Sequence, residues 1–204
     1  AAASDVYKRQ EGMTIIMIGH RGHPEVEGTM GQAPEGIHLV ESIHDVQTLT
    51  IKADTPVAYV TQTTLSVDET KEIVDALKAK YPHIQQPKKQ DICYATQNRQ
   101  DAVKFMAPQV DLVIVVGSPN SSNSNRLREL SEKLGVVSYM VDHPSQLKPE
   151  WFVGKKRIGL TAGASAPESL AQSIIDRIKE LGPKSVRPLE GIVENTAFPL
   201  PKGL

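Results

Sequence analysis

Four polar loops follow apolar, β-branched runs in this sequence, and a single cysteine lies between the second loop and the third. The runs with their loops read IIMIGHRGHPEVEG, VAYVTQTTLSVDE, DLVIVVGSPNSSNSNR and RIGLTAGASAPE, and Cys93 lies in DICYATQNRQ. A loop that follows a parallel strand presents hydroxyls, amides and backbone N–H groups, which open α/β sheets use to bind anions. The pattern indicates one anion site assembled from most of the chain.

The first loop, GHRGHPEVEG, contains two histidines and two glutamates. His23 could supply a cation for a phosphate and Glu25 a carboxyl group for proton transfer, since both types can be tuned towards neutral pH. Acidic residues after Pro24 are also ordinary in a first helical turn, because the helix dipole favours them there. His23-Pro24-Glu25 also opens the zinc-deaminase signature, but the cysteine pair that completes it is missing, which excludes a deaminase.

The other three loops are rich in hydroxyl and amide side chains. Thr63 lies in the second loop, although threonine is also common in strands and ordinary loops. The third loop contains Ser121, Ser122 and Asn123, a density of donors that suits a phosphate cradle, while a single hydroxyl would be enough to cap the helix. The fourth loop adds Ser165 just before an expected helix. None has the G-x-x-x-x-G-K pattern of a nucleoside triphosphate site, so ATP and GTP are not indicated.

Cys93 is the only cysteine, which excludes an internal disulfide. It lies just before an expected helix over residues 95–106, with Tyr94 between them, and a helix N-terminus favours the thiolate that metal binding or nucleophilic attack requires. An inert apolar cysteine is the plain alternative. The residues by themselves therefore indicate an anion-binding α/β protein with a candidate reactive thiolate.

Composition and charge narrow the class of protein. The 204 residues carry a formal net charge of -1 with a scattered distribution of Lys and Arg, which gives no reason to expect nucleic acid as a partner. Neither a long apolar run nor a signal peptide is recognisable, so we expect no membrane partner and a soluble, intracellular protein.

Strand and helix patterns alternate from residue 14 onward, which is typical of doubly wound α/β architecture. Ser66 and Glu69 form an expected capping box for one helix, and Pro82 ends it. A second helix is expected from about Pro167 to Gly182. The expected strands are Thr14–Ile18, Ile37–Val40, Val57–Thr61, Leu112–Val116, Ser138–Val141 and Ile158–Thr161.

The chain divides into four expected segments. Residues 1–10, AAASDVYKRQ, look like a translated cloning scar and are left out of the fold prediction. Residues 11–90 and 91–184 are expected to form one α/β unit each, joined by a polar linker over 82–91. Residues 185–204 are rich in Pro and are expected to wrap over a neighbouring unit.

The motifs together resemble the 4-hydroxy-3-methylbut-2-enyl diphosphate reductase family, also called LytB or IspH. The strings that carry the resemblance are IGHRGHPEVEGTMGQ, TQTTLSVDET, DICYATQNRQ, VVGSPNSSNSNRL, TAGASAPE and PLEGIVENTAFPLP. They occur in order from about residue 14 to the C-terminus. The resemblance implies two of three pseudo-equivalent α/β units, the second and third of the family, with small, mainly parallel sheets around a central site.

The resemblance also implies a reaction, the last step of the non-mevalonate isoprenoid pathway. The family removes the allylic hydroxyl of its substrate reductively and gives isopentenyl and dimethylallyl diphosphates. It uses a [4Fe–4S] cluster held by three cysteines, with one iron open to the substrate, and electrons from reduced ferredoxin or flavodoxin. A bacterial cytoplasm or a plastid is the implied location.

The family's site residues carry over onto the matching motifs. Cys93 corresponds to the third cluster cysteine, Glu25 to the acid that delivers protons, and Thr63 to the residue that orients the substrate hydroxyl. The implied diphosphate contacts are His23, Ser121, Ser122, Asn123 and Ser165.

The chain departs from the family pattern in its cysteine content. Family members have an N-terminal α/β region with two further cluster cysteines and two histidines, so we expect this chain to be N-terminally truncated and inactive as a reductase. Two other classes stay open. A non-catalytic diphosphate-binding module would keep the Ser/Asn loops without the cluster, and a sugar-phosphate isomerase would need neither Cys93 nor iron.

Overall fold

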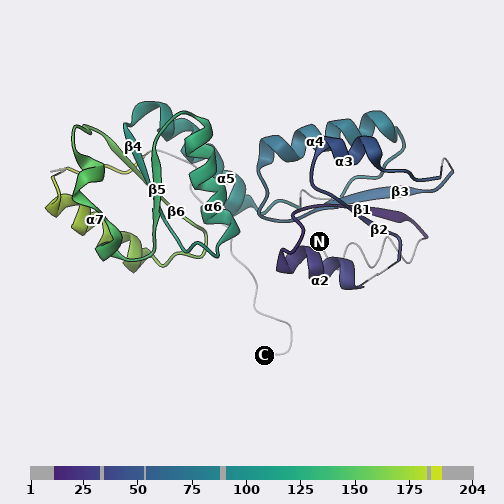
Figure 1. The fold of residues 1–204 in the computed structure, drawn as a ribbon, viewed down its shortest axis with the longest axis horizontal. Coiled ribbons are helices and arrows are strands. Elements are labelled where there is room, and N and C mark those ends of the chain that lie inside the picture. Colours follow the sequence, from purple (N-terminus) through teal and green to yellow (C-terminus); the bar gives the residue numbers. More distant parts are fainter. Residues whose placement is uncertain (1–11, 33–34, 53, 88–90, 183–184, 190–204) are drawn as a thin grey trace.

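The structure of the protein, a computed structural model, describes residues 12–32, 35–52, 54–87, 91–182 and 185–189. This part of the chain contains two three-stranded parallel sheets with helices packed on their faces. The two sheets lie in separate halves of the molecule (Figure 1). The α/β fold class expected from the sequence is confirmed.

The first sheet has the strand order β2-β1-β3. Its strands are β1 (Thr14–Ile18), β2 (Ile37–Val40) and β3 (Val57–Thr61). Three helices cover it, α2 (Pro24–Gln32), α3 (Ile43–Thr48) and α4 (Val67–Lys80). Strand β1 is central and its sequence TIIMI is almost completely buried, as expected for a parallel strand with both faces covered. These elements are called the first unit below.

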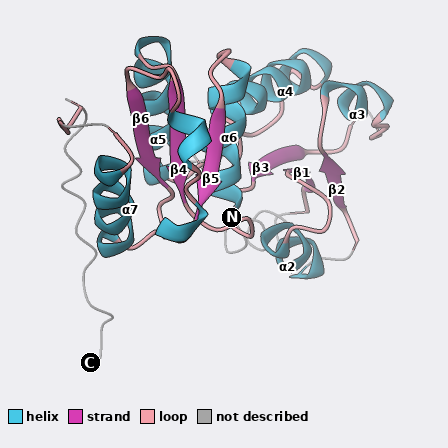
Figure 2. Cartoon of the chain, turned by 60° about the vertical axis from the view of Figure 1, so that its left-hand side comes forward, coloured by secondary structure: helices cyan, strands magenta, loops and turns pink. Residues whose placement is uncertain are grey.

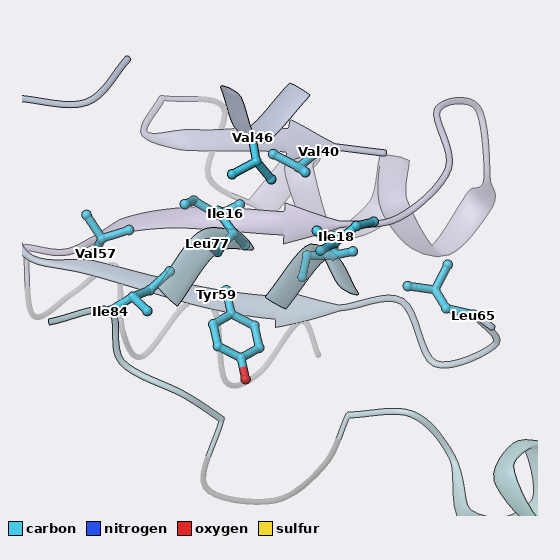
Figure 3. Close-up of a cluster of buried hydrophobic side chains, with 10 residues drawn as sticks. Ile16, Ile18, Val40, Val46, Val57, Tyr59, Leu65, Leu77 and Ile84 are labelled. Atoms are coloured by element: carbon cyan, nitrogen blue, oxygen red, sulfur yellow. The ribbon is translucent and has the colours of Figure 1, made fainter. Parts of the chain in front are cut away.

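The two faces of the first sheet bury alternate residues of β1. Ile16 and Ile18 pack against Leu77 of α4 and Val46 of α3 (Figure 3). Met17, on the opposite face, belongs to a second cluster that includes Val26 of α2. Burying a large aliphatic side chain of this kind stabilises the fold by roughly 1.5–3 kcal/mol.

The second sheet has the equivalent order β5-β4-β6. Its strands are β4 (Leu112–Val116), β5 (Ser138–Val141) and β6 (Ile158–Ala162). Its α-helices are α5 (Tyr94–Met106), α6 (Ser122–Lys133) and α7 (Glu168–Glu180). Short 3-10 turns lie at Ala107–Gln109, Pro144–Gln146 and Pro149–Phe152. These elements are called the second unit.

Helices cover both faces of the second sheet, with α7 on one side and α6 on the other (Figure 2). Ile174 of α7 packs against Leu112, Ile114 and Val116, whereas Val113 and Val115 face α5 and α6. Each unit thus buries its own apolar core.

The expected strands are confirmed at the stated bounds, except that β6 extends one residue further, to Ala162. The four polar loops follow β1, β3, β4 and β6. In both sheets these are the central strand and one edge strand, while β2 and β5 occupy the other edge. The loops therefore leave the carboxyl ends of equivalent strands.

The helix caps agree with the sequence in part. Ser66 caps α4, since its hydroxyl accepts from the Glu69 N–H at 3.3 Å. The capping box expected there is incomplete, because the Glu69 carboxylate lies 3.5 Å from Lys133 instead of returning to the cap. A complete box occurs at Ser42 and Asp45, at the start of α3.

The segment expected as a linker is partly joined to the first sheet. Gln85 forms a parallel bridge with β3, and Ile84 is buried in the core beneath α4. The expected scar, residues 1–10, and most of the expected tail lie outside the described residues. Residues 185–189 form neither helix nor strand. No helix of the described chain has the length and apolar character needed to cross a membrane.

Candidate functional site

Glu25 and Thr63 form the first part of the candidate site. Glu25 lies in the first turn of α2, and Thr63 lies two residues beyond β3. The Thr63 N–H donates to both carboxylate oxygens of Glu25 at 3.1 Å, and its hydroxyl donates to Oε2 at 2.9 Å. The contacts fix the orientation of the Glu25 carboxyl group, and the hydroxyl oxygen of Thr63 keeps acceptor capacity for a ligand.

His23 joins the first unit to the second. Its Nε2 lies 2.7 Å from the Ser122 hydroxyl oxygen, and its Nδ1 accepts from the Glu25 N–H at 3.2 Å. Because Nδ1 accepts, a neutral ring carries its proton on Nε2 and donates it to Ser122. The hydroxyl proton of Ser122 is then available to donate to an anion.

The start of α6 is held close to the ends of β4 and β6. Ser124 is completely buried, and a Cβ atom on Gly117 or Gly163 would lie about 2.1 or 2.2 Å from its Oγ. A side chain on Gly117 would also clash with the Ser124 Cβ atom at 2.6 Å and displace the helix, whereas one on Gly163 would displace the Ser124 hydroxyl from Ser121. Ser121 caps α6 and accepts hydrogen bonds from the N–H and the hydroxyl of Ser124. Only its own proton remains to donate to a ligand.

Asn123 has an unusual environment in the first turn of α6. It is 6% exposed, yet neither its amide nitrogen nor its amide oxygen has a hydrogen-bond partner among the residues that the structure describes. A buried amide without a partner is costly, so its persistence calls for an explanation. A ligand that accepts from Nδ2 and approaches the neighbouring Ser122 would supply one.

Cys93 lies beside the first unit's loop. It is exposed at the N-cap of α5, and its backbone N–H donates to the Thr63 carbonyl at 3.1 Å. The helix begins at Tyr94, one residue earlier than expected. The backbone of Cys93 thus contacts that of Thr63, and the Cys93 thiol lies at a helix N-terminus.

Ser165 is exposed in the turn between β6 and α7. The turn is closed by a hydrogen bond from Ala166 N–H to the Gly163 carbonyl at 3.0 Å. Gly163 in turn abuts Ser124, so the loop lies next to the start of α6. Among the predicted site residues, hydrogen bonds join His23 to Ser122 and Glu25 to Thr63. Ser165 lies near the start of α6 because its loop packs against Ser124.

Gln62 and His20 are functional candidates that the sequence did not single out. The Gln62 side chain is buried, accepts from the His20 N–H at 3.0 Å and donates to the Thr64 hydroxyl at 3.0 Å. It ties the loop after β1 to the loop after β3. Burial lowers the pKa of His20 below 6.5, and the nearby Arg126 lowers it further. Gln62 lies in the motif TQTT, but a glutamine in that motif does not indicate by itself that its side chain contacts the loop after β1.

Within the described residues, no group of three or more His, Cys, Asp or Glu side chains is arranged to hold a metal ion. Cys93 is the only thiol in the whole sequence. A cluster of the [4Fe–4S] type relies on several cysteine thiolates. The residues of this chain therefore do not fit a complete cluster site, although Cys93 is suited to be one of its ligands.

Comparison with known proteins decides the family. The sequence profile of the family described as LytB protein matches residues 2–179. The chain belongs to the LytB family. The resemblance read from the motifs is thereby confirmed.

Curated relatives of this LytB chain are named as reductases. The chain is 72% identical to the 4-hydroxy-3-methylbut-2-enyl diphosphate reductase of Ralstonia nicotianae over 196 residues, which cover 96% of the chain and 60% of that protein. It is 69% identical to reductase 2 of Burkholderia mallei with the same coverage. The chain thus spans about 60% of the length of these relatives.

A solved structure has the same fold as this LytB chain. The E-1-hydroxy-2-methyl-but-2-enyl-4-diphosphate reductase from Plasmodium falciparum superposes with a TM-score of 0.84 and 38% sequence identity. The match covers 87% of the present chain and 56% of that one. The arrangement of two parallel three-stranded units is therefore shared with a larger reductase.

Proposed function

We propose that the chain is the diphosphate-binding and proton-donating part of a 4-hydroxy-3-methylbut-2-enyl diphosphate reductase. The reaction is reductive dehydroxylation to isopentenyl and dimethylallyl diphosphate, the terminal step of the non-mevalonate pathway. Family membership and the names of the relatives support the reaction class. The observation that carries the assignment is the buried, unpartnered amide of Asn123 beside the His23–Ser122 contact.

The loops of the second unit supply the proposed donors for the diphosphate, and His23 of the first unit orients one of them. His23 polarises Ser122, whose hydroxyl proton is free to donate to a phosphate oxygen. The Asn123 amide and backbone N–H groups at the start of α6 add donors, and the helix dipole favours negative charge there. Ser121 and Ser165 complete the proposed set of contacts.

Glu25 is the proposed proton donor and Thr63 the residue that orients the substrate hydroxyl. The two Thr63 donors hold the Glu25 carboxyl group in one orientation. The Thr63 hydroxyl oxygen can accept from the allylic hydroxyl of a bound substrate, which would bring that hydroxyl next to Glu25. A proton delivered from Glu25 would convert the hydroxyl into water, a better leaving group.

The reductase of this family requires a [4Fe–4S] cluster, and Cys93 is the proposed ligand from this chain. Since Cys93 is the only cysteine, we propose that the 204-residue chain made alone holds no complete cluster and does not reduce substrate. By itself it would act as a diphosphate-binding module. The longer enzyme would take electrons from ferredoxin or flavodoxin and work in the cytoplasm or a plastid.

Calorimetry with inorganic pyrophosphate tests the proposal. We expect one site on the wild-type chain, weakened in Asn123→Ala, and no cluster absorbance after treatment with iron and sulfide. Absence of pyrophosphate binding would contradict the assignment. Binding of a sugar phosphate without pyrophosphate binding would favour an isomerase instead, and retention of such isomerase activity in Cys93→Ala would strengthen that alternative.

A further inference from the structure

Helix α5 lies on the side of the second unit that faces the first (Figure 1). Cys93 is at its start, and the same sequence motif, DICYATQNRQ, continues along the helix to Arg99 and Gln100. These last two residues have no part in the proposed binding or proton transfer. Their side chains nevertheless reach both substrate loops.

Gln100 reaches the loop of the first unit that carries Thr63. Its side chain is 2% exposed, accepts from the Val67 N–H at 3.0 Å and donates to the Leu65 carbonyl at 2.8 Å. Both amide atoms are therefore satisfied by backbone groups of one loop, and these groups come from the other unit. A buried side-chain amide that is paired in this way specifies one arrangement of the two segments.

Two further contacts lie on the same side of α5. The Cys93 N–H donates to the Thr63 carbonyl, and the Lys104 ammonium lies 2.8 Å from an Asp68 carboxylate oxygen. Residues 93, 100 and 104 are seven and four positions apart, a spacing that places them along one face of a helix. This face of α5 therefore contacts the loop at three places. Cys93 contacts it at Thr63, Gln100 at Leu65 and Val67, and Lys104 contacts Asp68 in the first turn of α4.

Arg99 reaches in the other direction, toward the loop that carries Ser165. Its Nε donates to the carbonyl of Ala162, the last residue of β6, at 3.2 Å, and its Nη1 donates to the Ala95 carbonyl at 3.2 Å. Ala162 immediately precedes Gly163 and the turn with Ser165. Adjacent residues of one helix thus contact the loop that follows β3 in the first unit and the end of β6 in the second.

We propose that Gln100 and Arg99 are positioning residues that set the Thr63 loop and the Ser165 loop relative to Cys93. Gln100 acts on the loop that orients the reacting hydroxyl, and Arg99 acts on the loop that contacts the diphosphate. Neither residue touches the substrate. The part of this inference that concerns the substrate rests on the proposed function, whereas the placement of the loops does not.

Amide hydrogen exchange on the 204-residue chain tests the placement without any ligand. Gln100→Met keeps the length of the side chain and removes the contacts to Leu65 and Val67. It should speed exchange of the Thr63 N–H by about tenfold or more, because loss of these contacts loosens the loop that carries Thr63. Exchange at Gly163 should stay within about twofold. Arg99→Met should show the reverse pattern. Gln97→Met, the same chemical change one turn earlier on α5, should alter neither loop.

Equal acceleration at both loops in every variant, or none at either, would overturn the proposal. If Gln100→Met does not fold, Lys104→Met replaces it, because Lys104 lies at the exposed end of the same face. The same selectivity for Thr63 is then required.

A binding experiment adds a readout that loosening of the fold alone would not give. Arg99→Met should weaken pyrophosphate and 4-hydroxy-3-methylbut-2-enyl diphosphate by the same factor. Gln100→Met should leave pyrophosphate affinity within about twofold and remove the additional affinity of the hydroxylated ligand, since that increment depends on Thr63. A uniform loss for both ligands in Gln100→Met would contradict the positioning role. If the wild-type chain binds neither ligand, the proposed function fails while the exchange data still decide the placement.

Discussion

The side chains of His23 and Ser122 lie 2.7 Å apart, between Nε2 and Oγ, although the two residues belong to different α/β units. This contact joins the loop after β1 to the start of α6. It also orders a chain of hydrogen bonds from the Glu25 N–H through the imidazole ring to a serine hydroxyl. An anion bound at Ser122 in the second unit would therefore be linked through that serine to His23 in the first unit.

Replacing Ser122 by Ala should weaken pyrophosphate binding by about tenfold, the scale of one hydrogen bond to a charged group. The change removes the hydroxyl that His23 polarises and leaves the helix cap, Ser121, in place. Isothermal calorimetry measures the difference. Ser145→Ala is the matched control, because the Ser145 hydroxyl lies 2.7 Å from a ring nitrogen of His143 on an exposed turn away from the site. Comparable losses in both variants would contradict the role of Ser122.

Replacing Asn123 by Leu should separate stability from binding. The Asn123 amide is buried without a partner in the described part of the chain, so an apolar side chain of similar size should leave the free energy of unfolding unchanged or raise it by about 1 kcal/mol. Pyrophosphate should stabilise the wild-type protein and not the variant, as measured by thermal unfolding with and without the anion. A variant that is clearly less stable in the absence of anion would show that the amide has a structural partner.

Replacing Thr63 by Val should lower the free energy of unfolding by about 1 kcal/mol, because the hydroxyl contact with Glu25 is lost while the backbone contact stays. Urea denaturation measures the change. Thr61→Val provides the control, since the Thr61 hydroxyl, two residues earlier, is buried and has no hydrogen-bond partner within the described segments. That variant should be as stable as the wild type or more stable. The reverse order of the two variants would contradict the assigned geometry.

His20 should make the protein less stable in mild acid. Its pKa is lowered in the fold, first by burial and then by Arg126, while Glu41, Glu129 and Glu69 act in the opposite sense. The fold therefore favours the neutral ring of His20. The contribution of this neutral ring to the free energy of unfolding is complete above pH 6.5, the ordinary pKa of histidine, and is lost as the pH falls below that value.

Urea denaturation between pH 7.5 and pH 5.5, values that bracket about one unit on each side of the ordinary pKa, measures this effect. The free energy of unfolding should fall more steeply with acidification in the wild type than in His20→Gln, which cannot titrate. Identical slopes for the two proteins would show that His20 does not contribute.

The strands were predictable because each central strand is a continuous apolar run. TIIMI and LVIVV are buried on both faces, which leaves one interpretation for a run of that length between turns. Local caps were predictable to a lesser extent. Ser66 caps α4 as expected, but Glu69 pairs with Lys133, a partner in the other unit that no local pattern reveals.

The site was predictable in its loops and not in the contacts that hold them. His23 lies in a loop, and Glu25 and Ser122 lie at the helix starts that follow such loops, in segments whose composition indicates anion chemistry. Gln62 and Gln100 look like ordinary polar residues in the sequence, and their importance comes from backbone groups that tertiary structure brings to them. Single-sequence patterns describe neighbours along the chain, so contacts between the two units are beyond their reach.

The most direct test of a shared diphosphate site is a pyrophosphate titration of the 15N-labelled chain followed by NMR. The backbone amides of Asn123 and Ser165, whose loops contact the anion, should shift together with the amide of His23, which is linked to the anion through Ser122, and with one dissociation constant. Shifts confined to a single unit, or no shift in any of the three loops, would contradict a site formed jointly by the two units.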